Sequence, residues 1–372
     1  MTHSKLPNTL FLRSNTPRRG RRKPSAISSV KSPINRDEFI KGTIAMRYIT
    51  PALVLAAGLG VTFAVPTPSV AADQISVAVG TLGGTMGRLG AGLTDVVNKN
   101  QTDMKLSVTP GGGRANPARV STGGADFGYS FTNFTATALA GKAPFDKKYP
   151  NLRVVARFYN ACYHQYVGRD VYDSGIQSWE DIVAAKKPLK IALVKKGTST
   201  EYTGSVIVKA LGSSYEKMAA RGDKQTFTGT GANSRAIRSG QIDIYFHNSG
   251  DPNGAGIQAA LGRDLTFLKL TPKLKSILTE NGYSPCTIPG GIYKGNDKPT
   301  ESMGLSGVLL TTDKMDAKAV YNILKIAAAN KKTLSAVHKI YKDWTPQFGA
   351  QVGSLPLHPG AAKFFKEVGA IN

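Results

Sequence analysis

Apolar residues in this chain follow the spacing of a β-strand in some segments and that of an amphipathic helix in others. Residues 75–79 alternate apolar with small or polar side chains, which is typical of a strand. After a glycine turn, apolar residues recur at helical spacing on one face, namely Leu89, Leu93, Val96 and Val97. A second such face near the C-terminus consists of Val320, Ile323, Leu324 and Ala327. Both segments are therefore predicted to be helices with one buried face.

Strand and helix signals continue to alternate along the rest of the chain. Further strands are predicted at 106–108, 125–129, 152–158, 164–167, 189–194, 242–246 and 267–270. Helices are predicted from about Asn116, after the capping residue Ser178, from the turn at 197–200 to Ala210, and before Gly240. Strands that alternate with helices indicate an α/β fold with parallel-rich sheets that are flanked by helices.

The N-terminal segment has the features of an export signal. Residues 1–45 are polar and basic, residues 52–65 form a 14-residue apolar stretch, and Val70 and Ala72 fit the −3 and −1 positions of a cleavage site. We therefore expect removal of residues 1–72, with cleavage after Ala72, and a periplasmic location. An uncleaved anchor is the alternative, but a membrane span needs about 20 apolar residues.

The basic extension that precedes this signal is unusual, and Met46 would be a natural start. One alternative is a twin-arginine export signal that uses Arg18 and Arg19, although this pair lies far upstream of the apolar stretch. Another is a nucleic-acid-binding arm, against which export argues. We expect no nucleic-acid partner.

Composition and charge narrow the class of protein. Of 372 residues, 41% are hydrophobic and 19% are charged, which excludes intrinsic disorder over most of the chain. A mean hydropathy of −0.18 with one long apolar run excludes a polytopic membrane protein. The length favours two domains. The net charge of +24 falls to +15 without residues 1–72, a value that fits solubility and a modest attraction for anions.

Three loops share one design, in which a strand ends, a run of small residues follows, and a helix begins. They are 81–85, 109–113 and 195–200. Helix N-termini present unpaired N–H groups and a partial positive charge, and glycine lets an anion approach the backbone. A carboxylate or a phosphate is the expected guest. The alternative is that these are ordinary turns with capping Thr and Ser residues.

Ordered motifs along the chain resemble one family. The sequence is similar to the TAXI branch of the substrate-binding proteins of tripartite ATP-independent periplasmic (TRAP) transporters, over residues 74–372. The segments that carry the resemblance are 79–86, 109–116, 125–128, 152–156, 175–181, 197–200, 239–243, 288–293 and 355–361. The final His-Pro-Gly-Ala segment, which contains His358, is the most specific of them.

The resemblance implies a two-lobed periplasmic binding protein of type II, like a Venus flytrap. Lobe 1 would comprise residues 74–165 and 304–372, and lobe 2 residues 166–303. Such a protein closes on a small carboxylate or amino-acid-like solute, without a cofactor, and delivers it to TRAP permease subunits in the membrane. Met86, Gly113 and the Ser199–Thr200 order depart from the family pattern, so the solute can differ from those of relatives.

The loops supply the candidate ligand-binding residues, which are Gly84, Thr85, Met86, Gly112, Gly113, Asn116, Thr198, Ser199, Thr200, Asn248 and Asp251. Asn116 can bond a carboxylate or cap a helix. Asp251 can bind a ligand amine or close a turn. The cations Arg114, Lys195 and Lys196 can hold a carboxylate or lie in solvent. The aromatic residues Phe131, Tyr159 and Tyr163 can wall a pocket or pack in the core.

Other functions remain open at the level of sequence. A ligand-binding sensory component that acts on a membrane receptor would share these features. An enzyme is disfavoured, because the histidines lack i, i+4 metal spacing and we find neither a nucleophile elbow nor a phosphate-binding loop. Cys162 and Cys286 form either a disulfide, which an oxidising compartment permits, or two buried thiols.

Overall fold

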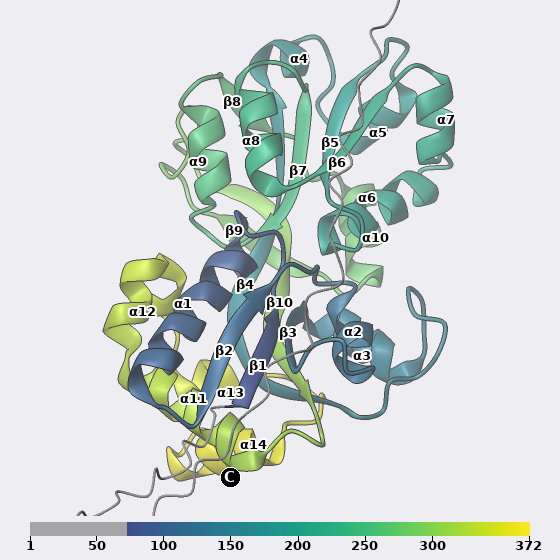
Figure 1. Cartoon of the computed structure of the whole chain (residues 1–372). Helices are drawn as coiled ribbons and strands as arrows, with labels where there is room; N and C mark the ends of the chain where they lie inside the picture. Colours follow the sequence, from purple (N-terminus) through teal and green to yellow (C-terminus); the bar gives the residue numbers. More distant parts are fainter. Residues whose placement is uncertain (1–72) are drawn as a thin grey trace, which may run out of the picture. The chain divides into compact units, whose positions relative to one another are not determined.

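One ten-stranded mixed sheet runs through residues 73–372, the part of the chain that the computed structural model describes (Figure 1). The predicted extension and signal peptide, residues 1–72, lie outside it. The strand order is β2-β1-β3-β10-β4-β7-β5-β6, with β8 paired to β4 and β9 paired to β10. The strands are β1 (Asp73–Ala78), β2 (Met104–Thr109), β3 (Phe127–Phe131), β4 (Leu152–Gly168), β5 (Lys190–Val194), β6 (Lys224–Thr228), β7 (Ile244–Ser249), β8 (Leu265–Phe267), β9 (Ser284–Ile288) and β10 (Thr300–Thr312).

Helices cover this sheet. They are α1 (Thr85–Asn100), α2 (Asn116–Ser121), α3 (Thr132–Ala140), α4 (Arg169–Asp173), α5 (Trp179–Ala184), α6 (Ser199–Ala210), α7 (Tyr215–Ala220), α8 (Thr230–Arg238), α9 (Gly254–Ala260), α10 (Pro272–Glu280), α11 (Ala317–Ala329), α12 (Lys331–Val337), the 3₁₀ helix η1 (Lys339–Lys342), α13 (Pro346–Ala350) and α14 (Pro359–Glu367). Within residues 73–372, none of them is both long and apolar enough to cross a membrane.

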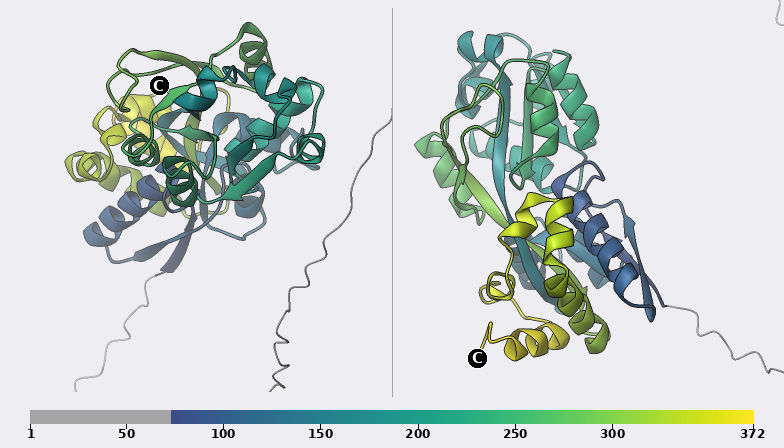
Figure 2. Two further views of the ribbon diagram at one scale, coloured as in Figure 1. Left: turned by 90° about the horizontal axis from the view of Figure 1, so that it is seen from above. Right: turned by 90° about the vertical axis from the view of Figure 1, so that its left-hand side faces the viewer.

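Two lobes share the sheet, as Figure 2 shows from the side. Lobe 1 contains β1–β3, α1–α3 and α11–α14, and lobe 2 contains β5–β8 and α4–α10. Pairing is parallel between β1 and its neighbours β2 and β3, and likewise between β5 and its neighbours β6 and β7. The antiparallel strands β4 and β10 pass from one lobe to the other. The two-lobed α/β prediction is confirmed.

Strand β4 joins the two segments, 152–158 and 164–167, that were predicted as separate strands. Its first part pairs with β10 and its last part pairs with β7 and β8. Tyr159, Cys162 and Tyr163 lie between the predicted segments and are all buried, so no alternating pattern marks the middle of the strand. The predicted lobe boundaries at 165/166 and 303/304 lie inside β4 and β10.

The predicted faces of α1 and α11 are buried, which confirms both helices. The face of α1 packs in the same cluster as Ile75, Val77 and Val79 of the first strand segment. Ala78 points to the opposite side, where it packs with Val120 and the helix residue Ala138. The first strand therefore carries α1 on one face and α2 and α3 on the other.

A disulfide links Cys162 of β4 to Cys286 of β9. The two residues are 124 positions apart, and their Cα atoms are separated by 5.9 Å. Of the two alternatives that the sequence left open, the structure contains the bridge. The bridge therefore links β4, the strand that leads into lobe 2, to β9, which precedes the return of the chain to lobe 1 through β10.

Candidate functional site

A small cavity lies where the three glycine-rich loops of the two lobes meet. Its volume is about 30 Å³, which is room for about two water molecules. Lobe 1 contributes Gly80, Thr81, Gly84, Thr85, Met86, Gly113, Phe131 and Tyr159 to its lining. Lobe 2 contributes Val194, Thr198, Ser199, Thr200, His247 and Asn248.

Most of the predicted ligand-binding residues line this cavity. They are Gly84, Thr85, Met86, Gly113, Thr198, Ser199, Thr200 and Asn248. Gly112, Asn116 and Asp251 are outside the lining. Gly80, Val194 and His247 line it but were not predicted. Each of them adjoins or ends a segment with a strand pattern, and this position at the end of a strand is the signal that could have identified them.

Hydrogen bonds between the lobes surround the cavity. The hydroxyls of Thr81 and Thr230 are 2.6 Å apart, and those of Thr85 and Ser249 are 2.8 Å apart. The backbone N–H of Ala115 donates to the carbonyl oxygen of Gly197 at 3.1 Å. All three pairs join lobe 1 to lobe 2, so the structure has the lobes in direct contact.

Gly112 is needed for that contact. A Cβ atom at this position would lie 2.4 Å from the carbonyl oxygen of Gly197, which is closer than real Cβ atoms approach. Any side chain here would push the loop of lobe 1 away from the loop of lobe 2. Gly112 therefore sets how closely the lobes approach, although it does not line the cavity.

Asn116 lies beneath the loop and is fully buried. Its Nδ2 group donates to the carbonyl oxygens of Ala78, Val79 and Tyr129 at 3.0, 3.0 and 2.7 Å, and its Oδ1 accepts from the N–H of Gly112 at 3.1 Å. The whole amide is thus used inside lobe 1. This arrangement fixes the glycine loop to β1 and β3.

Asp251 lies away from the cavity, in a separate groove of about 680 Å³ that the disulfide also lines. Its Oδ1 is 2.8 Å from Nε2 of the buried His164 and accepts from the hydroxyl of Tyr293 at 3.0 Å. The carboxylate is therefore paired within lobe 2.

A chain of hydrogen bonds orients Asn248 and Thr200 at the cavity. The hydroxyl oxygen of Thr200 accepts from the backbone N–H of Asn248 at 2.9 Å. The side-chain Nδ2 of Asn248 donates to the hydroxyl oxygens of Tyr283 and Thr203 at 2.9 and 3.2 Å. Because the oxygen of Thr200 accepts from Asn248, its proton remains available to a molecule in the cavity.

His247 contributes a neutral donor. Burial lowers the pKa of His247 to about 3, with the nearby His164 as a further cause, so the ring is uncharged at neutral pH. The Oδ1 atom of Asn253 accepts a hydrogen bond from the backbone N–H of Ala255. This identifies the other amide atom as the Nδ2 donor, which is 3.0 Å from Nδ1 of His247. Nδ1 therefore accepts a hydrogen bond, and the proton is on Nε2, which is 3.5 Å from Thr230.

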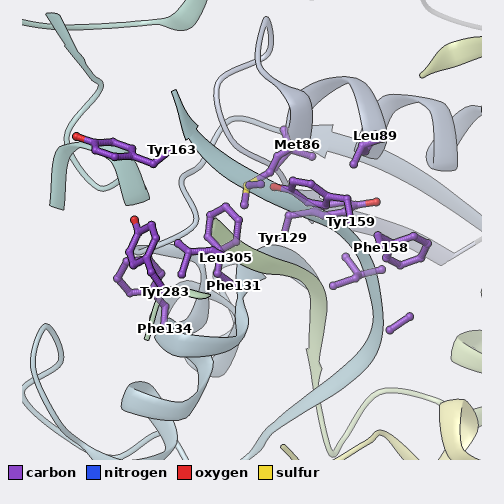
Figure 3. Close-up of a cluster of buried hydrophobic side chains, with 14 of the residues drawn as sticks. Met86, Leu89, Tyr129, Phe131, Phe134, Phe158, Tyr159, Tyr163, Tyr283 and Leu305 are labelled. Atoms are coloured by element: carbon purple, nitrogen blue, oxygen red, sulfur yellow. The ribbon is translucent and has the colours of Figure 1, made fainter. Parts of the chain in front are cut away.

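Three side chains make one wall of the cavity apolar. Figure 3 shows Met86, Phe131 and Tyr159 together, and the rings of Phe131 and Tyr159 have centroids 6.0 Å apart. Tyr163, which was the third candidate for a pocket wall, instead stacks on Phe246 inside lobe 2. The cavity thus has an apolar side from lobe 1 and a hydroxyl-rich side from lobe 2.

Ionised side chains lie only outside the lining, as far as residues 73–372 are concerned. A guanidinium nitrogen of Arg114 in lobe 1 is 3.9 Å from a carboxylate oxygen of Glu201 in lobe 2. Lys195 and Lys196 are exposed. Of the predicted cations, Arg114 is therefore in an ion pair between the lobes and the two lysines face solvent.

Helix N-termini supply the positive potential of the site. Helix α1 begins at Thr85 after Gly84, which has no side chain to cap it, and α8 begins at Thr230 after Gly229 in the same way. Helix α6 begins at Ser199, with the Thr198 hydroxyl as its cap. The first turns of α1 and α6 thus line the cavity, and α8 begins beside it, where the hydroxyl of Thr230 bonds the lining residue Thr81. Uncapped N–H groups attract anions.

The fold resembles several solved structures at low sequence identity. One is PhnD1 from Prochlorococcus marinus in complex with methylphosphonate, with 12% identity, a TM-score of 0.46, and coverage of 80% of this chain and 99% of that one. Another is MatC from Rhodopseudomonas palustris with bound malate, with 13% identity, a TM-score of 0.45, and coverage of 72% and 88%. A third is the alkanesulfonate-binding protein SsuA from Xanthomonas axonopodis pv. citri bound to MOPS, with 14% identity, a TM-score of 0.39, and coverage of 80% and 85%.

A family model matches residues 77–369, nearly all of the part that the structure describes. It covers both lobes and every residue of the cavity lining. This chain therefore belongs to the NMT1-like family.

Proposed function

We propose that this protein is a periplasmic solute-binding protein that captures a small carboxylate between its lobes and delivers it to a TRAP-type permease. The observation that supports this most is the cavity between the lobes. The first turns of α1 and α6 and five Thr and Ser hydroxyls line it, and within the described residues its lining contains no acidic side chain that would repel an anion.

Binding and closure are coupled in this proposal. The lobes are connected through β4 and β10, and the loops of both lobes contribute to the same cavity. A solute larger than the 30 Å³ cavity enters only when the lobes separate further. Contacts that form with both lobes favour the closed arrangement by the difference in affinity between the closed and open forms.

Titration of the purified protein with simple carboxylates tests the binding step. Succinate, acetate and propionate are suitable probes, with the corresponding amides as neutral controls. We expect heat of binding with at least one carboxylate and none with its amide. Thr200→Val should weaken binding about 10–100-fold because the cavity loses a hydroxyl donor, whereas Thr200→Ser, which keeps the hydroxyl, should bind like the wild type.

Uptake into vesicles that carry the purified permease tests the delivery step. We expect solute accumulation that follows an imposed sodium gradient and needs no ATP. Uptake that depends on ATP would replace the TRAP permease with an ATP-driven importer. Binding without uptake, together with a response of a membrane receptor, would favour the sensory alternative.

A further inference from the structure

The orientation of the Asn248 amide is determined by its neighbours. The hydroxyl of Thr203 donates its single proton to the carbonyl oxygen of Ser199 at 2.7 Å. Its oxygen can then only accept, so the Asn248 side-chain atom 3.2 Å away must be the Nδ2 donor. The same nitrogen donates to Tyr283. The Oδ1 atom therefore lies on the other side of the amide.

Within residues 73–372, this Oδ1 atom has no hydrogen-bond partner. Among the described residues that line the cavity, it is the one fully buried side-chain oxygen or nitrogen in this condition. The Asn248 residue is 7% exposed, so bulk water does not satisfy its oxygen. Buried polar groups in proteins are nearly always hydrogen-bonded, so a molecule in the cavity, either water or the solute that displaces it, supplies the donor here.

The site is poorly suited to an ammonium group. Its lining residues include neither Asp nor Glu in the described part of the chain, and Asp251 is paired with His164 and Tyr293. His247 is neutral, and the helix N-termini around the cavity carry partial positive charge. An ammonium group would add a buried cation that no carboxylate neutralises. A hydroxyl group brings the needed donor without a charge.

We infer that the solute is a carboxylate that carries a hydroxyl group and no ammonium group, and that Asn248 Oδ1 accepts the hydrogen bond from this hydroxyl. The inference rests on the proposed function and narrows its solute class. In this arrangement the hydroxyls of lobe 2 and the N–H groups of α1 and α6 bind the carboxylate. Asn248 then selects hydroxy acids over amino acids and over acids that lack the hydroxyl.

Calorimetry with matched sets of three acids tests this assignment on the purified protein. The sets are glycolate, glycine and acetate; lactate, alanine and propionate; and malate, aspartate and succinate. Each set keeps the carbon skeleton and changes one substituent among hydroxyl, ammonium and hydrogen. In the set that binds best, we expect the hydroxy acid to bind at least tenfold more tightly than the other two members.

Two variants of Asn248 and one control make the test specific. Asn248→Leu removes the acceptor, and we expect the preference for the hydroxy acid over its deoxy counterpart to fall below threefold. Asn248→Asp places a carboxylate in the wall, and we expect weaker binding of the hydroxy acid and a relative gain for the amino acid. Asn100→Leu changes an exposed residue at the far end of α1 and should keep the wild-type preference.

Each outcome separates the two proposals. Tighter binding of the amino acid, equal binding of all three members, or an unchanged hydroxyl preference in Asn248→Leu would overturn the Asn248 assignment and leave carboxylate binding intact. Failure of all nine acids to bind would overturn the proposed carboxylate function, and this inference with it.

Discussion

Replacing Asn116 by Asp changes one buried atom and tests how the glycine loop is held. Asn116 is fully buried, and its Nδ2 group donates to three carbonyl oxygens. In Asn116→Asp, a carboxyl oxygen takes the place of this donor. Ionised, it would face the carbonyl oxygens of Ala78, Val79 and Tyr129 without a proton between them. The variant therefore folds only if the carboxyl stays protonated or the loop moves.

The size of the effect follows from the cost of that protonation. An unfolded Asp has a pKa of about 3.9, so keeping it protonated at pH 7 costs about 4 kcal/mol at about 1.4 kcal/mol per pH unit. The folded variant has a raised pKa and binds more protons than the unfolded chain above pH 4. Its stability relative to the wild type is therefore highest below about pH 4 and falls as the pH rises towards the raised pKa.

Urea denaturation of the wild type and of Asn116→Asp between pH 4 and pH 7 measures the difference in their free energies of unfolding. We expect the difference in free energy of unfolding to grow with pH and to reach about 4 kcal/mol at pH 7. Asn116→Ala provides the control, with a loss of about 1–3 kcal/mol that does not change with pH, because no group titrates. A difference for Asn116→Asp that is below 1 kcal/mol at every pH would refute the structural role.

Three further predictions concern other parts of the molecule. Replacing both Cys162 and Cys286 by Ser should destabilise the fold by about 5 kcal/mol in denaturant unfolding, since the bridge closes a loop over a separation of 124 residues; a loss below 1 kcal/mol would contradict this. Below pH 6.5 the wild type should lose stability, because His247 is buried neutral with a pKa of about 3 whereas it is protonated in the unfolded chain; His247→Gln should reduce this slope in urea titrations at pH 5 and 7. N-terminal sequencing of the exported protein should begin at Asp73, and an intact Met1 in the cytoplasm would exclude the predicted cleavage.

The sequence was sufficient to predict the elements whose apolar residues recur at one regular spacing. In α1 and α11, the apolar residues that were predicted to form one face of the helix are buried. The three loops were found because each combines small residues with a preceding strand pattern, and loops of this kind from both lobes line the cavity. Local spacing carries this information, so no knowledge of distant contacts was needed.

Strand β10 was not predicted, because the burial of its residues depends on partners that are distant in the sequence. Residues on both faces of Thr300–Thr312 are buried, so apolar and polar positions do not alternate. Gly307 interrupts the apolar run, and a Cβ atom there would lie 2.1 Å from the ring of Tyr159. The glycine is required by a side chain 148 positions earlier, which single-sequence periodicity cannot show.

The individual site residues depend on similar long-range contacts. Asn116 and Asp251 both have side chains suited to ligands, yet their partners are backbone carbonyls of β1 and β3 and the pair His164 and Tyr293. His247 directly follows a strand pattern, but its exposure to the cavity depends on how lobe 1 meets lobe 2. The residue type shows which hydrogen bonds or charges a side chain can offer. Tertiary contacts decide which of these side chains face the solute.

A crystal structure of the protein with the carboxylate that co-purifies with it, or with the tightest-binding acid of the nine, tests the central claim most directly. We predict that the carboxylate lies between the lobes, bonded to hydroxyls of Thr198, Ser199 or Thr200 and to N–H groups at the start of α1. A carboxylate bound instead in the groove beside Asp251 and the disulfide, with the cavity between the lobes unchanged, would contradict it.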